Sequence, residues 1–157
     1  MTEISIVISY SDTMQRVYTE SGYTAKARNG IGLSPELSDS MSASEDDSMI
    51  LERSFISGAK DAAALITRYM APCYMDIIRN DDTDIIEEIL LNFNAPRNFH
   101  PGVLTALEKS VEDFIAGHIM QKWMMIMKPD EADIAALKLQ NESIRIREML
   151  ATRKKPE

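Results

Sequence analysis

The chain has little cysteine, little basic charge and no long apolar run. Its single cysteine, Cys73, cannot form an internal disulfide, so the cysteine content does not require an oxidising compartment. No stretch approaches the ~20 apolar residues that a membrane-spanning helix needs. Residues 2–10 alternate between apolar and polar side chains, unlike the apolar block of a secretion signal. We therefore expect a soluble cytosolic protein with no membrane partner.

The deficit of basic residues limits the partners that the chain can bind. Acidic residues outnumber basic ones by 25 to 17, and the formal net charge is −8. Nucleic-acid backbones are bound by clustered Lys and Arg side chains, which this excess of acid opposes. The only local basic cluster is Arg153, Lys154 and Lys155, and a charged chain end of this kind is usually solvated. We expect no sequence-specific binding to nucleic acid.

The remaining composition is that of a globular protein with one core. Apolar residues make up 45% and charged residues 27% of the 157 residues. We expect a single domain over 1–157. It would comprise an N-terminal strand and short helix (1–28), a long loop or arm (29–44), and a helical body with a small β-hairpin (44–157).

The N-terminal part combines a strand pattern with a helix pattern. Apolar residues alternate from 3 to 10, which predicts a half-buried strand. Asp12 is the predicted N-cap of a short helix that ends at Gly22. Gly, Ser, Pro and acidic residues dominate 29–44, which predicts either a mobile surface loop or an arm that orders against a partner.

Three long helices and a hairpin are predicted for the rest of the chain. Ser44 and the acidic residues after it open a helix over 44–71, and helices at 101–127 and 130–152 should form an antiparallel pair. Between the first two, 74–78 and 85–93 predict a β-hairpin around an acidic turn, although a short helix near Glu87 stays open. The predicted fold class is mainly α (α+β): a bundle of about three main helices, an antiparallel C-terminal helical hairpin, a small β-hairpin and an N-terminal strand.

The acidic turn resembles the start of a calcium loop but lacks its other requirements. Asn80, Asp82 and Asp84 follow the alternate spacing of such a loop. The sixth and twelfth positions should be Gly and Glu, and the chain has Ile85 and Leu91 there. We interpret the segment as a solvated turn and expect no metal.

The residues that most often carry chemistry are few and isolated. His100 and His118 have no acid or cysteine at metal-ligand spacing beside them. Cys73 would need a base and an orienting group brought to it by the fold. No phosphate-binding glycine loop and no Gly-x-Ser-x-Gly turn is present in the sequence. We therefore expect no enzyme activity and no cofactor.

The final helix has two apolar stripes on opposite sides. Wound at about 100° per residue, it places Ile134, Leu137 and Ile144 on one side. The other side has a second set: Leu139, Ile146 and Leu150. A helix that covers only its own core needs one stripe, so the second must be covered by another subunit or by the same chain, for example by the N-terminal strand.

The end of the preceding helix is apolar on every side. Met124, Met125, Ile126 and Met127 surround it, and methionine adapts well to irregular partner surfaces. This collar and the second stripe of the final helix together predict a subunit contact. The candidate interface residues are Leu139, Ile146, Leu150, Met124, Met125 and Met127.

Several segments resemble those of small structural proteins from prophages. They are Val17-Tyr18-Thr19-Glu20-Ser21-Gly22-Tyr23, the helix opened by acids from Glu45, Leu90-Leu91-Asn92-Phe93-Asn94, and the paired helices with Trp123 and a final Arg153. In these the chain resembles the head–tail connector and neck-adaptor class of tailed phages. The resemblance implies a largely helical, ring-forming virion subunit with a small β-element and a long loop or arm. A ring needs two different faces of each subunit to meet, which a two-striped helix would suit.

We therefore expect a non-enzymatic virion structural subunit, a head–tail connector or neck ring component assembled in the bacterial cytoplasm. Its partners would be further copies in a homo-oligomeric ring and neighbouring virion proteins, with at most passive contact with packaged DNA. The alternative is a cytosolic helical adaptor or regulatory protein that binds a single protein partner.

Overall fold

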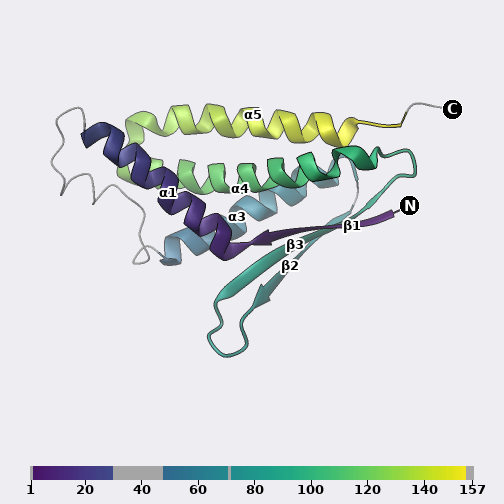
Figure 1. Ribbon diagram of the computed structural model, residues 1–157, viewed down its shortest axis with the longest axis horizontal. Helices are drawn as coiled ribbons and strands as arrows, with labels where there is room; N and C mark the ends of the chain where they lie inside the picture. Colours follow the sequence, from purple (N-terminus) through teal and green to yellow (C-terminus); the bar gives the residue numbers. More distant parts are fainter. Residues whose placement is uncertain (1, 30–47, 71, 155–157) are drawn as a thin grey trace.

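Four α-helices and a three-stranded antiparallel sheet make up the described part of the protein (Figure 1). The computed structural model describes residues 2–29, 48–70 and 72–154, with the side chains of 21–29 and 48 left out. This architecture confirms the predicted α+β class with mainly helical content. The loop or arm predicted at 29–44 lies, from residue 30 on, outside the described residues.

The first strand runs directly into the first helix. In β1 (Thr2–Ser9), Ile6 and Ile8 are fully buried while Ser5 and Val7 are exposed, which confirms the predicted half-buried strand. Helix α1 (Tyr10–Asn29) begins before the predicted cap at Asp12. The Asp12 backbone N–H donates to Ser9 Oγ at 3.3 Å, so Ser9 has the role of a capping residue.

Helix α1 is also longer than predicted, because it continues through Gly22 to Asn29. The predicted end at Gly22 was wrong. One glycine costs only about 1 kcal/mol within a helix. The following residues include Ala25 and Ala27, which favour the helical state and offset that cost.

The predicted hairpin is confirmed as two strands, β2 (Cys73–Arg79) and β3 (Ile86–Ala95). The sheet order is β1-β3-β2, so β3 is central and pairs antiparallel with both neighbours. One face of β3 is buried through Ile89, Leu91 and Phe93. The helices lie on that side of the sheet, while the hairpin extends away from them (Figure 1).

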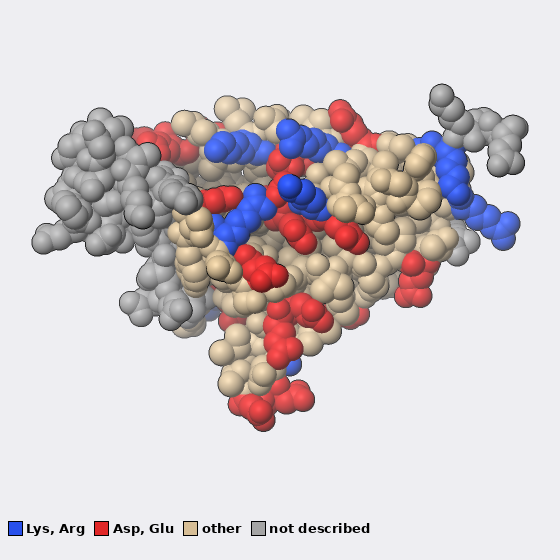
Figure 2. Space-filling model, in the orientation of Figure 1, with Lys and Arg blue, Asp and Glu red and all other residues tan. Residues whose placement is uncertain are grey.

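The turn between β2 and β3 is built around Asn80. Its side-chain Oδ1 accepts hydrogen bonds from the backbone N–H groups of Asp82 and Thr83 at 2.9 and 3.2 Å. Asp84 has a φ of 58°, a left-handed conformation that aspartate tolerates better than most residues. Residues 81–85 are all exposed, and acidic side chains gather at this tip (Figure 2), which confirms the predicted exposed acidic turn.

Helix α4 (Leu104–Met127) is central and packs against α1, α3 and α5. Helix α3 (Ser48–Thr67) approaches it closely at Gly58, where an added Cβ would lie 3.3 Å from the His118 Cβ. The predicted start of α3 at Ser44 lies outside the described residues, and its end falls at Thr67, four residues before the predicted end at residue 71.

The two C-terminal helices form the predicted antiparallel hairpin. Helix α5 (Ala132–Ala151) follows α4 after a single turn of 3₁₀ helix at Pro129–Glu131. A second such turn, Pro101–Val103, precedes α4, and His100 caps it by accepting a hydrogen bond from the Gly102 N–H at 3.0 Å. One core joins the sheet to the helices; its largest fully buried side chains are Phe55, Phe93, Ile6, Ile8, Leu51, Ile66, Ile89, Leu91, Leu107, Ile115, Ile119 and Ile146.

Candidate interaction surface

The two apolar stripes of α5 both exist, but their roles are the reverse of those predicted. Ile146 and Leu150 are fully buried in the core, and Leu139 is half-buried against it. Ile146 and Leu150 therefore pack inside the helical body and are not available to a neighbouring subunit, whereas Leu139 keeps part of its surface exposed. The prediction that Ile146 and Leu150 form a subunit interface was wrong, because both belong to the core.

The uncovered stripe lies on the opposite side of α5. Ile134, Leu137 and Ile144 are 59%, 61% and 43% exposed, and we call them the outer stripe. Uncharged side chains form most of the upper edge of the molecule, where α5 lies (Figure 2). Whether another subunit covers the outer stripe stays a prediction.

The N-terminal strand does not cover either stripe. β1 pairs along its length with β3, from Thr2 opposite Ala95 to Ser9 opposite Glu88. This pairing excludes the alternative in which that strand folds over the free side of α5.

The methionine collar at the end of α4 is only partly covered. Met124 and Met127 are half-buried and pack against the core, whereas Met125 and Ile126 are 52% and 56% exposed. Of the three methionines predicted at an interface, Met125 is therefore the most accessible. The collar lies at the end of the molecule where α5 begins, close in sequence to Ile134.

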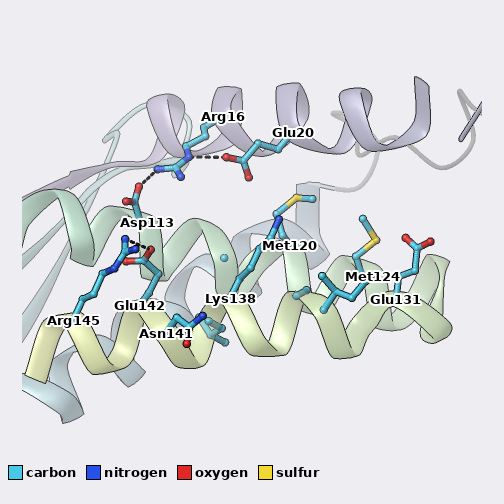
Figure 3. Close-up of a pocket in the computed structure, with 14 residues that line it drawn as sticks. Arg16, Glu20, Asp113, Met120, Met124, Glu131, Lys138, Asn141, Glu142 and Arg145 are labelled. Carbon is cyan, nitrogen blue, oxygen red and sulfur yellow. Dashed lines mark hydrogen bonds and ion pairs between the residues drawn. The ribbon is translucent and has the colours of Figure 1, made fainter. Parts of the chain in front are cut away.

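A groove with a volume of about 630 Å³ runs between α1 and α5 over α4 (Figure 3). Its apolar part comes from Gly117, Met120 and Met124 of α4, with Ile134 and Leu139 of α5. The charged rim residues lie on α1, α4, the 3₁₀ turn before α5, and α5; they are Arg16, Glu20, Asp113, Glu131, Lys138, Glu142 and Arg145.

Several rim charges pair with one another. Arg16 lies between Glu20, at 2.9 Å, and Asp113, and Arg145 contacts Glu142 at 3.2 Å (Figure 3). Exposed pairs of this kind contribute little stability, so they chiefly hold the long side chains in place. Sequence reasoning missed the groove, because Arg16 and Asp113 are far apart in the chain.

The residues considered for chemistry lie on different elements: Cys73 begins β2, His100 caps the turn before α4, and His118 lies within α4. Burial raises the pKa of the Cys73 thiol to about 11, so it stays protonated at neutral pH and is a poor nucleophile. His118 is 5% exposed, with Nδ1 3.5 Å from Asp61 Oδ2. Burial lowers the pKa of His118, and the Asp61 carboxylate opposes that shift.

Neither a metal centre nor a membrane span is visible within residues 2–29, 48–70 and 72–154. No three His, Cys, Asp or Glu side chains in these ranges converge as metal ligands. None of their helices has the length and hydropathy to cross a bilayer.

The chain matches none of the protein families, curated proteins or solved structures with which it was compared. The surface of the protein therefore provides the grounds for a function, and its outer stripe is an aligned set of exposed aliphatic side chains.

Proposed function

We propose that the protein is a non-enzymatic structural subunit that acts by binding other protein subunits through the outer stripe of α5. The observation that carries this proposal is the pair of contrasting faces on one helix. Ile146 and Leu150 are fully buried, while three equally large aliphatic side chains on the other side are 43–61% exposed. Single exposed apolar residues are common, but an aligned set on a rigid helix is typical of a contact surface.

The proposed setting is a tailed-phage or prophage particle, as a head–tail connector or neck ring component assembled in the bacterial cytoplasm. The sequence resemblance to that class supports this setting, and a mainly helical body with a small sheet is compatible with it. A ring needs two different contact surfaces on each subunit. The outer stripe could supply one, and exposed Met125 and Ile126 could supply the other.

Lysine substitution of the outer stripe tests the proposal. We expect the triple variant Ile134→Lys, Leu137→Lys, Ile144→Lys to keep the helical circular dichroism and thermal midpoint of the parent, because these side chains contribute little to the core. Its assembly should be lost, as measured by light scattering over a range of concentrations and by recovery in particles from a producing host.

The matched control is Val7→Lys, which changes a 48% exposed aliphatic side chain on the sheet. It should assemble like the parent. A folded triple lysine variant that still assembles normally would show that the outer stripe is not the contact surface.

The alternative is a helical adaptor that binds one protein partner and has no place in a particle. The groove between α1 and α5 favours this alternative, since its apolar floor and charged rim could take a partner side chain or helix. Mass spectrometry of purified particles separates the two functions, because only a virion subunit would be present in them. Terminase, portal and capsid genes beside its gene would also favour the first function.

A further inference from the structure

The exposed face of α5 has the spacing of a coiled-coil seam. Ile134, Leu137, Asn141 and Ile144 are separated by three, four and three residues, which is the alternation of the two core positions of a heptad. All four side chains are exposed. The buried Ile146 lies on the opposite side of the helix, so the body of the subunit leaves this seam free.

The one polar member of the seam is informative. Asn141 occupies the same heptad position as Ile134, with Leu137 and Ile144 at the other core position. A single asparagine at that position favours a two-stranded parallel pair, because two asparagines then face each other and satisfy their hydrogen bonds. In an antiparallel pair Asn141 would instead face leucine or isoleucine and stay unpaired.

The charges beside the seam agree with the parallel arrangement. Asp133 flanks one side and Lys138 the other, five residues later, the offset at which flanking residues meet across a parallel pair. Neither forms an ion pair with another residue of the described ranges, and both are exposed. In an antiparallel pair with Asn141 opposite the partner's Leu137, Lys138 would lie beside the partner's Lys138, which is repulsive.

We propose that α5 pairs with α5 of a second copy of this chain as a parallel two-stranded seam. Asn141 faces the partner's Asn141, and Asp133 faces the partner's Lys138. This inference rests on the proposed function and makes it more specific, because it identifies the partner and the orientation. The contact is two-fold, so the collar residues Met125 and Ile126 remain available for a ring built from pairs.

The pair should be weak in the isolated protein. Its apolar part ends at Ile144, since the next seam position is Glu148, where like charges would meet. A stable dimer buries a total surface of about 1,200 Å² or more, and so short a seam should bury less than that. A covalent trap is therefore a better probe than a size measurement.

Cysteine trapping tests both the partner and the orientation. Ile134→Cys and Ile144→Cys are made separately in a Cys73→Ser background, and glutathione disulfide is the oxidant. Residues 134 and 144 are about 15 Å apart along the helix, which is beyond the ~7 Å between the Cα atoms of a disulfide. A parallel pair therefore predicts that each variant links to itself, and that a mixture of the two, distinguished by mass, gives no mixed dimer above background.

Val7→Cys in the same background is the collision control. The proposal is overturned if the α5 variants link no faster than this control, or if the mixed dimer forms in preference, which would show an antiparallel pair. Removing the asparagine with Asn141→Leu should let mixed dimers appear, because the orientation is then less strictly specified.

The outcomes separate this inference from the proposed function. If the triple lysine variant loses assembly but the cysteines do not self-link, the outer stripe binds a different protein and only the pairing is wrong. If the lysine variant assembles normally and the cysteines do not link, both proposals are wrong.

Discussion

His118 of α4 is a buried polar side chain that faces α3. A Cβ added at Gly58 of α3 would lie 3.4 Å from its ring, and the Asp61 carboxylate lies 3.5 Å from Nδ1. Its Nε2 atom is buried without a hydrogen-bond partner among the described residues. Burial therefore disfavours the imidazolium, which lowers the pKa, while Asp61 acts in the opposite direction and the Lys122 charge adds to the lowering.

This shift predicts a loss of stability in mild acid. The unfolded chain takes up the proton near pH 6.5, and the folded protein only at a lower pH, so the unfolded state binds more protons between these values. The free energy of unfolding should therefore fall as the pH decreases from about 7 through 6.5 towards the folded pKa. Urea unfolding at several pH values would measure it.

His118→Gln should remove this part of the pH dependence, whereas His100→Gln, an exposed capping residue, should keep it. An unchanged slope in the His118→Gln protein would mean that other groups cause the acid sensitivity.

At the scale of elements, α5 is a helix whose two faces should respond very differently to the same substitution. Ile146→Ala removes a fully buried side chain and should lower the free energy of unfolding by about 2–5 kcal/mol. Ile144→Ala, two residues away and 43% exposed, should change it by only about 0.5 kcal/mol. Urea unfolding of the two variants below the concentration of pairing measures the difference. Equal losses would contradict the assignment of inner and outer faces.

The sequence predicted the elements well because their signals are local. Alternation identified β1, apolar and β-branched composition around a polar run identified the hairpin, and helical spacing identified α4 and α5. The stripe that faces inward could not be predicted, since both stripes contain large aliphatic residues at helical spacing. Which stripe faces inward depends on how α5 is rotated about its own axis against α4, and long-range contacts decide that rotation. The extent of α1 was missed for a similar reason, because Gly22 is a stop signal only where the surroundings allow it.

At the scale of the whole molecule, one core connects elements from both ends of the chain. Ile6 of β1, Trp123 of α4 and Ile146 of α5 belong to the same cluster of buried residues. We therefore predict a single domain that unfolds in one cooperative transition. Far-UV circular dichroism, which follows the helices, and fluorescence of the only tryptophan should give the same urea midpoint. Separate midpoints would show that the sheet and the helical body are independent units.

The candidate interaction surface was only partly predictable at this scale. A subunit contact on α5 and the collar was inferred from apolar excess, and the accessible residues proved to be the outer stripe with Met125 and Ile126. The groove was not inferred, because it requires α1 to lie beside α4 through contacts such as Arg16 with Asp113. Such contacts join residues far apart in the chain, so the local sequence pattern does not predict them.

The separation of the two faces of α5 also has an evolutionary consequence. One set of residues on α5 packs in the core, and a different set would bind a partner. No position of the helix belongs to both sets. Substitutions at positions 134, 137, 141 and 144 could therefore accumulate, and change the preferred partner, without a loss of folding. The same separation makes α5 a suitable site for grafting a new binding specificity onto an unchanged core.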